Sequence, residues 1–230
     1  MTEDTNNFEE LMEVIRPEIS FDIQNEASEK NSVEKSERLT ENRVFEKNPI
    51  KKAKQLCNDT IGWLRIPNTL IDYPVVQGAD NDYYLHHSMD QKENELGCPF
   101  LDYRCESDFS GFTNIIYGHH FTEMRMFADI FSFKDRNFLE EHSSGYLITE
   151  TEMIPITFFA YLNVKSNSPI YHAVFLTDKE KLDYIDTLYD EALYTVSYEK
   201  IDLIDKRFIL LSTCTFEFDD ARGVLVGFIE

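Results

Sequence analysis

Two residues near the C-terminus, Cys214 and Arg222, have the types and the spacing for thiol chemistry. In the stretch RFILLSTC, which ends at Cys214, side chains alternate between the faces of an expected strand, so Ser212 and Cys214 share a face. A second expected strand, 222–230, follows the acidic connection 215–221. In an antiparallel hairpin, Cys214 and Arg222 would lie opposite or diagonal, about 5–8 Å apart. A cation beside a thiol favours the nucleophilic thiolate.

A cysteine nucleophile also needs a base, and histidines are the candidates. The best placed are in TNIIYGHHF, where an apolar strand is expected to stop at Gly118 and to present a histidine at its end. Neighbouring residues of an extended strand face opposite sides, so only one of His119 and His120 can face Cys214. A histidine at a strand end is more often a surface residue, and a cysteine in an apolar strand more often packs than reacts. The residues alone therefore leave catalysis and simple packing both open.

A metal site is the alternative use of these residue types. Cys98, Cys105 and the two His–His pairs lack the short Cys–Cys or His–His spacings of common zinc sites. The four cysteines are also too few and too irregularly spaced for a disulfide scaffold. We therefore expect no metal ion and no other cofactor.

The elements that must position these residues are mostly strands. β-Branched and aromatic residues fill short runs that Gly, Asn, Asp or Pro interrupt. Ahead of the two C-terminal strands these runs are residues 61–67, 71–77, 98–103, 113–118, 145–149 and 153–164. Many short strands at this spacing favour a closed barrel or a sandwich.

Two helices are expected between the strands. The stronger one covers residues 177–193 and opens with a Thr177–Glu180 capping box. Its apolar side chains recur at helical spacing on one side, as Leu182, Ile185, Leu188, Ala192 and Leu193. The weaker one covers residues 126–133. We expect the stronger helix to lie on the barrel.

The chain divides by composition into two parts. Residues 1–54 are expected to form a helical arm followed by a polar linker, and residues 55–230 a compact domain. The 43 acidic and 22 basic residues give a net charge of −21, which repels phosphate backbones, so we expect no nucleic-acid partner. No apolar run approaches the roughly 18–20 residues of a membrane span, and the N-terminus lacks the pattern of a signal peptide. The sequence thus indicates a cytoplasmic protein or a chain without its targeting segment.

The motifs IGWLRIPNTLIDYPVVQGADNDYYL, NIIYGHH and LSTC, the last followed by an arginine eight residues on, together resemble the sortases, the cysteine transpeptidases of Gram-positive surfaces. The resemblance spans residues 60–230, and the helical arm and the inserted helix make it most similar to class B. It implies a closed eight-stranded β-barrel with a helix inserted before the cysteine strand. Cys214 would then be the nucleophile, His119 the general acid and base, and Arg222 the stabiliser of the substrate carbonyl. The acidic connection offers side chains to hold the guanidinium, namely Glu217, Asp219 or Asp220.

The same resemblance suggests residues for a peptide-binding groove. Asn81 and Leu85 match a class B segment that forms a wall for the peptide, and at i and i+4 they would face one side of a helical turn. Ser212, on the face of Cys214, is expected to hydrogen-bond the peptide. Ile170 and Tyr171 are expected to line the entrance to the inserted helix.

The resemblance also implies substrates and a location. A sortase of this class would cleave a sorting-signal peptide of a secreted surface protein after Thr, in an NPxT-like or SPxT-like motif, through a thioacyl-enzyme. It would transfer the acyl group to an amine of peptidoglycan or of a pilin, on the extracellular face of the cell membrane. Since sortases carry a membrane anchor, we expect a soluble form whose anchor preceded the arm. Two alternatives are a non-catalytic barrel that binds wall peptides or partner proteins, and a cysteine peptidase that only hydrolyses.

Overall fold

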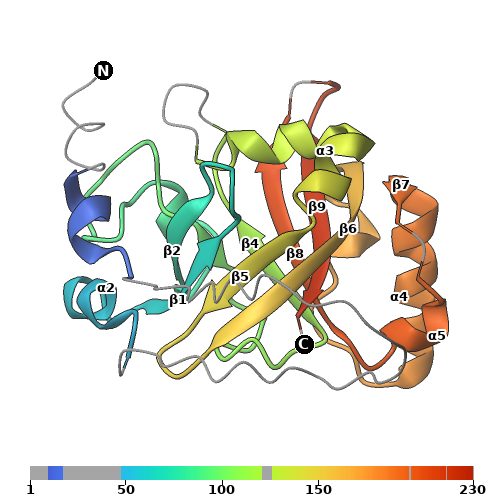
Figure 1. Cartoon of the computed structure of the whole chain (residues 1–230), viewed down its shortest axis with the longest axis horizontal. Helices are drawn as coiled ribbons and strands as arrows, with labels where there is room; N and C mark the ends of the chain where they lie inside the picture. The colour runs from blue at the N-terminus through green and yellow to red at the C-terminus, as the bar shows by residue number, and fades with distance from the viewer. Residues whose placement is uncertain (1–9, 18–47, 121–125, 197, 216, 230) are drawn as a thin grey trace, which may run out of the picture.

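The protein is built around one closed sheet. The computed structural model describes residues 10–17, 48–120, 126–196, 198–215 and 217–229. The sheet order is β5-β1-β2-β3-β4-β8-β9-β6-β7, and a further pairing of β5 with β6 closes every strand except β7 into a barrel (Figure 1). The predicted mainly-β, eight-stranded barrel is confirmed, with β7 as an extra strand on the edge of β6. The strands are β1 Thr60–Arg65, β2 Asp72–Val76, β3 Phe100–Leu101, β4 Thr113–Tyr117, β5 Ser144–Ile148, β6 Met153–Lys165, β7 Ala192–Thr195, β8 Arg207–Cys214 and β9 Ala221–Ile229.

In the part of the chain that the structure describes, the helices are short except for α4. They are α2 Lys51–Leu56, α3 Arg136–Glu141, α4 Asp178–Glu191 and α5 Lys200–Leu203, with 3-10 turns η1 Tyr83–Leu85, η2 Ala128–Lys134 and η3 Pro169–Tyr171. Residues 10–15 are also helical. The weaker of the two predicted helices, residues 126–133, is thus realised mainly as the 3-10 turn η2. No helix within the described ranges is long and apolar enough to cross a lipid bilayer.

Helix α4 is the inserted helix expected before the cysteine strand. Both hydrogen bonds of the Thr177–Glu180 capping box are present. The helix flanks the sheet beside β7 (Figure 1), burying Tyr184, Ile185 and Leu188. The prediction that Ala192 and Leu193 belong to this helical face was wrong: the helix ends at Glu191, and both residues belong to β7, which pairs with β6. Residue Leu193 is 53% exposed. Pairing with the edge of β6 determines the structure here, although the apolar residues keep their helical spacing.

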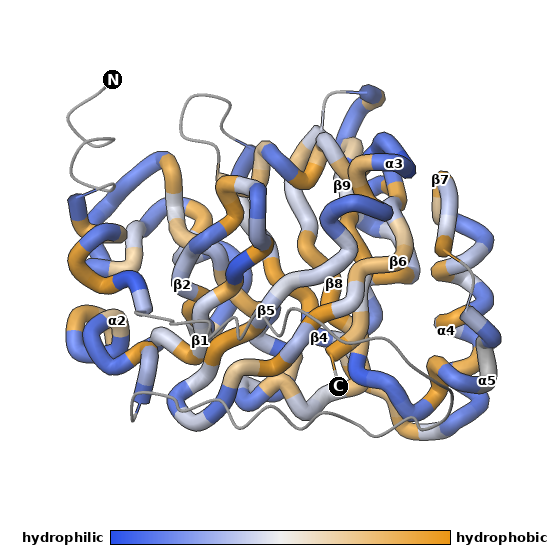
Figure 2. Tube along the Cα trace, viewed as in Figure 1, coloured by the Kyte–Doolittle hydropathy of each residue, from blue (hydrophilic) through white to orange (hydrophobic). Residues whose placement is uncertain are grey.

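Strands β8 and β9 are mostly apolar, and β8 is drawn largely in the hydrophobic colours of Figure 2. In β8 every residue is buried except the two ends, Arg207 and Cys214, and in β9 only Arg222 is incompletely buried. Strands that are covered on both faces need near-continuous apolar sequence, as these have. At the end of the hairpin that carries the connecting loop, the first incompletely buried strand residues are therefore Cys214 and Arg222.

The N-terminal helix packs against the barrel. Met12 and Ile15 are buried, and Arg16 forms an ion pair of 3.0 Å with Asp72 of β2. The Asp72 carboxylate also accepts a hydrogen bond of 2.6 Å from the indole of Trp63. Residues 18–47, which include most of the predicted polar linker, lie outside the described residues, so the division into residues 1–54 and 55–230 stays a prediction.

Candidate active site

The β8–β9 hairpin brings Cys214 and Arg222 together. The two strands are antiparallel, and Cys214 and Arg222 are directly opposed Cα partners, which confirms the predicted opposition. The Cys214 side chain is partly exposed, whereas the other three cysteines are buried. Because the pairing is made by backbone hydrogen bonds, the thiol and the cation are held by the barrel itself.

His119 reaches the same end of the barrel through the neighbouring strand. Strand β4 is parallel to β8, with Tyr117 opposite Ser212, and the Gly118 N–H donates to the Ser212 carbonyl at 3.1 Å. Two parallel strands end at the same edge of a sheet, so His119 follows β4 where Cys214 ends β8. Its Nε2 donates to the carbonyl of Leu85 at 2.8 Å, which fixes the direction of the ring.

The turn that carries His119 depends on a glycine. A Cβ at Gly118 would stand 2.7 Å from the ring of Phe127, closer than side chains approach one another. The Phe127 N–H also donates to the His119 carbonyl at 3.1 Å. The chain therefore passes tightly under this ring, and His119 leaves the strand in a defined direction.

The guanidinium of Arg222 is held by its own loop. Its Nη2 lies 3.1 Å from Asp220, and its Nη1 donates to the Ala221 carbonyl at 3.0 Å. A hydrogen bond from Ser166, followed by the charge of Arg222, holds the pKa of the Asp220 carboxyl below its usual value. Among the three acidic residues expected to do this, Asp220 pairs with the arginine, while Glu217 contacts Lys134 and Asn163.

The segment with Asn81 and Leu85 differs from the expected helical turn. Turn η1 covers only Tyr83–Leu85, and Asn81 precedes it. The Asn81 amide is engaged on both sides: Nδ2 donates to Asp102 at 2.9 Å, and Oδ1 accepts from the Tyr103 N–H at 3.0 Å. The helical reason for grouping Asn81 with Leu85 was therefore wrong.

Ser212 and Tyr171 form a hydroxyl pair beside the thiol. Their oxygens are 2.8 Å apart, and both residues are largely buried. Burial raises the pKa of Tyr171 to about 12, partly offset by the hydrogen bond with Ser212 and the charge of Arg222. Ile170 is fully buried, and its carbonyl accepts from Tyr184 at 3.1 Å, so in this structure it anchors the turn η3.

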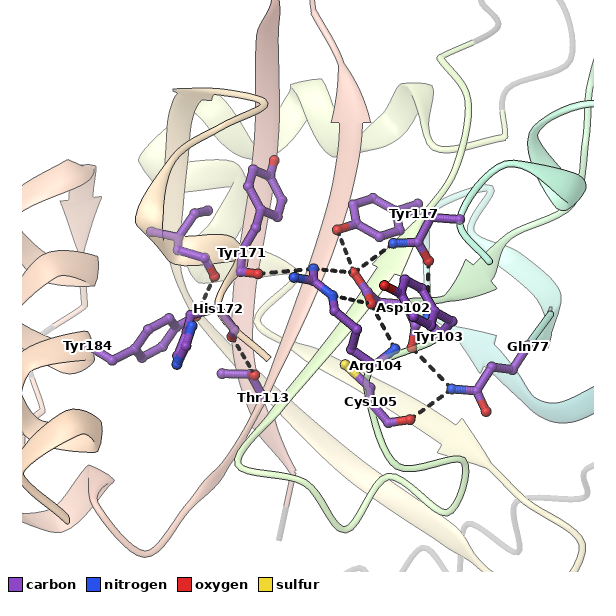
Figure 3. A network of polar contacts seen from close by, with 12 residues as sticks. Gln77, Asp102, Tyr103, Arg104, Cys105, Thr113, Tyr117, Tyr171, His172 and Tyr184 are labelled. Carbon is purple, nitrogen blue, oxygen red and sulfur yellow. Dashed lines mark hydrogen bonds and ion pairs between the residues drawn. The ribbon is translucent and has the colours of Figure 1, made fainter. Parts of the chain in front are cut away.

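An ion pair between a buried carboxylate, Asp102, and a partly exposed arginine, Arg104, was missed from the sequence. The Arg104 side chain donates two hydrogen bonds to Asp102, from Nε at 2.9 Å and from Nη2 at 2.6 Å (Figure 3), and the Arg104 backbone N–H donates a third at 2.9 Å. The signal was present in LDYR, where an acid at the end of an apolar run is followed two residues later by an arginine. A buried carboxylate needs such a partner.

The candidate metal ligands do not gather. Within the described ranges no group of three His, Cys, Asp or Glu side chains could hold a metal ion. Burial raises the pKa of the Cys105 thiol to about 11, and it also raises the pKa of Cys98. Buried thiols of this kind are unreactive at neutral pH.

Comparisons with known proteins identify relatives for this barrel. No protein-family model matches the sequence. Sortase B of Listeria monocytogenes serovar 1/2a (strain EGD-e) is 33% identical over 177 residues, which cover 77% of this chain and 71% of that protein. The crystal structure of Clostridium perfringens sortase B superimposes with a TM-score of 0.73 at 28% identity, covering 78% of this chain and 98% of that one. A Staphylococcus aureus sortase B–substrate complex, 22% identical, shares the fold with a TM-score of 0.71 over 78% of this chain and 83% of that one.

These similarities place the barrel among the sortase-type cysteine transpeptidases, enzymes that act at the cell surface and anchor proteins to the cell wall. The predicted enzyme class is thereby confirmed. The identity to the L. monocytogenes relative, sustained over most of both chains, also decides the group: the chain belongs to the sortase B family.

Proposed function

We propose that this enzyme cleaves an NPxT-like or SPxT-like sorting motif after Thr and transfers the acyl group to an amine of the cell wall or of a pilin. The observation that carries the proposal is the opposition of Cys214 and Arg222 at a barrel edge that His119 also reaches. The proposed nucleophile is Cys214, because it is the one partly exposed cysteine and lies opposite a cation, Arg222. The proposed acid and base is His119.

The first half of the reaction forms a thioester. The Cys214 sulfur attacks the carbonyl carbon of the Thr residue, and the carbonyl oxygen becomes an oxyanion that accepts hydrogen bonds from Arg222. The C–N bond then breaks as His119 gives a proton to the departing amine. The leaving peptide carries that proton away, and the acyl group remains on sulfur.

The second half transfers the acyl group. An acceptor amine attacks the thioester carbon and loses a proton to His119, and the C–S bond breaks to restore the thiolate. The products are a new amide bond and the free enzyme. We propose Nδ1 as the nitrogen that exchanges this proton, since Nε2 donates its own hydrogen to the Leu85 carbonyl, which can only accept.

Two solved relatives support a peptide donor and an amine acceptor. The S. aureus sortase B structure is a complex with a substrate, and another sortase B structure is complexed with triglycine, which bears a free amine. For this chain we propose the same two kinds of ligand, a sorting-signal peptide and an amine of peptidoglycan or of a pilin. Both are met at the extracellular face of the cell membrane, where we propose that the enzyme works.

The test is an assay of a labelled sorting-type peptide with and without added triglycine. We expect a new amide product that depends on triglycine, and we expect Cys214→Ala to abolish both cleavage and transfer while retaining the thermal unfolding of the wild type. Cleavage that triglycine never diverts would favour a hydrolytic peptidase. Binding of the peptide without any cleavage would favour a non-catalytic barrel, and turnover by Cys214→Ala would overturn the mechanism.

A further inference from the structure

Asp102 is a carboxylate that the barrel buries completely. It follows β3 directly and is 0% exposed. Besides the two bonds from the Arg104 side chain, it accepts from Asn81 at 2.9 Å and from the Tyr117 hydroxyl at 3.0 Å. Burial by itself raises the pKa of Asp102, but the hydrogen bonds and the charge of Arg104 outweigh it, so the pKa is lower than usual. The carboxylate therefore stays charged and ties its donors together.

The ion pair extends to the hydroxyl pair beside the thiol. The Arg104 Nη2 also donates to the Tyr171 carbonyl at 3.2 Å (Figure 3). The Tyr171 hydroxyl lies 2.8 Å from the Ser212 hydroxyl. Ser212 lies two residues before Cys214 on the same face of β8. The rings of Tyr117 and Tyr171 lie 6.0 Å apart, so the residues that contact Asp102 and those that contact Arg104 are close to one another.

The turn that carries Tyr171 is not part of the sheet. It lies in the connection between β6 and α4, and its backbone is held from outside by side chains. The hydroxyl of Thr113 donates to the His172 carbonyl at 2.8 Å, and Tyr184 donates to the Ile170 carbonyl. The contact from Arg104 is the charge-assisted member of this set, and such bonds are roughly twice as strong as neutral ones.

We propose that Asp102 and Arg104 are positioning residues of the peptide groove. They hold the Tyr171–Ser212 hydroxyl pair, together with Tyr117 and Asn81, in the geometry that binds the sorting peptide next to Cys214. This inference rests on the proposed function. In this proposal neither Asp102 nor Arg104 contacts the reacting atoms.

The network should control binding more than chemistry. The Leu85 carbonyl that orients His119 belongs to a turn with its own supports: Asp80 accepts from the N–H groups of Asp82 and Tyr83, and Tyr84 donates to Asp59 at 2.6 Å. The Cys214–Arg222 pairing is made by the hairpin backbone. Removing the Asp102 charge therefore loosens the groove wall and leaves the groups proposed for chemistry in place.

The experiment compares Asp102→Asn and Arg104→Lys with wild type in peptide cleavage. We expect KM to rise about 10- to 100-fold, the range for losing one or two hydrogen bonds to charged groups, while kcat stays within about threefold. The rate of Cys214 alkylation by iodoacetamide should be unchanged. The matched control is Asp72→Asn, which also removes a hydrogen-bonded carboxylate; the donors to Asp72 are Arg16 and Trp63. Asp72 lies on β2, which β3 and β4 separate from β8. The control substitution should lower stability without raising KM.

Hydrogen exchange separates this inference from the proposed function. In Asp102→Asn, the amides of residues 168 and 170–172 should exchange faster, while those of β6 should not change. If wild type cleaves no sorting peptide, the proposed function fails, and the exchange result still decides whether Asp102 positions the turn. An unchanged KM and unchanged exchange in a folded Asp102→Asn would overturn the inference, as would an equal rise of KM in Asp72→Asn. Should Asp102→Asn fail to fold, Arg104→Lys gives the same two readouts.

Discussion

Replacing Arg222 by lysine separates the charge of this side chain from its shape. In the structure the guanidinium uses two N–H groups, one toward Asp220 and one toward the Ala221 carbonyl. A guanidinium has five N–H donors in a fixed plane, so about three remain for a substrate oxyanion. An ammonium has three, and if it keeps both contacts about one remains, on a flexible stem with no set direction. The charge is conserved, but the directed donors are lost.

The expected loss follows from what an oxyanion donor contributes. One preorganised donor is worth about 10²–10³ in rate. We therefore expect Arg222→Lys to lower kcat about 10²-fold and Arg222→Ala about 10³-fold. If Arg222 acted only through its field, lysine would preserve most of the turnover, because a nearby cation favours the thiolate whichever side chain carries it.

The assay combines peptide turnover with the pH dependence of Cys214 alkylation. A large loss of turnover in Arg222→Lys with an unchanged alkylation profile is the expected result. The matched control is Arg207→Lys, the same substitution at the other end of β8, which should leave both readouts unchanged. Near-normal turnover of Arg222→Lys would refute the oxyanion role. The oxyanion role would also be refuted if the pH profile of alkylation shifted far enough to explain the whole loss of turnover.

Further predictions concern the other groups. His119→Ala should lower turnover about 10²–10⁴-fold and His120→Ala far less, and equal losses would contradict the assignment. Maleimide should modify native protein once, at Cys214, and denatured protein four times, as counted by mass spectrometry, because the other cysteines are buried. The depressed pKa of Asp102 means that it stabilises the fold above its unfolded pKa of about 3.9 and that this contribution fades as pH falls below it. The gap in melting temperature between wild type and Asp102→Asn should therefore be wide at pH 7 and narrow near about pH 3. Ile15→Ala should lower the free energy of unfolding by about 2–5 kcal/mol in urea titrations, since Ile15 is buried against the barrel.

The hairpin at the active site could be predicted because its signals are local. Alternating side chains and an interrupting acidic connection set the strands, and the register of a hairpin follows from its turn. The opposition of Cys214 and Arg222 then needs no distant contact. His119 is different, since it reaches this edge through a parallel pairing of β4 with β8 between segments about ninety residues apart. Only the family resemblance placed it there.

The groove network was beyond local reasoning. Asn81, Asp102, Tyr117 and Tyr171 come from four separate segments, and no spacing in the sequence shows that they share a carboxylate and its partner. The error at β7 has a related cause. The helical period of α4 continues to Leu193, but the edge of β6 offers backbone hydrogen bonds that the last turn of a helix cannot match.

The Cys214–Arg222 pair and the proposed groove wall are held in place by different kinds of contact. The thiol and the cation are fixed by backbone pairing, which any sequence that forms the hairpin reproduces. The proposed groove wall is held by side chains, above all by the hydrogen bonds of Asp102 and Arg104, which a single substitution removes. Substitutions can therefore alter which peptide the wall accepts without disturbing the pairing that supports the chemistry. We therefore expect single side-chain substitutions in this barrel to change the peptide preference before they change the catalytic chemistry.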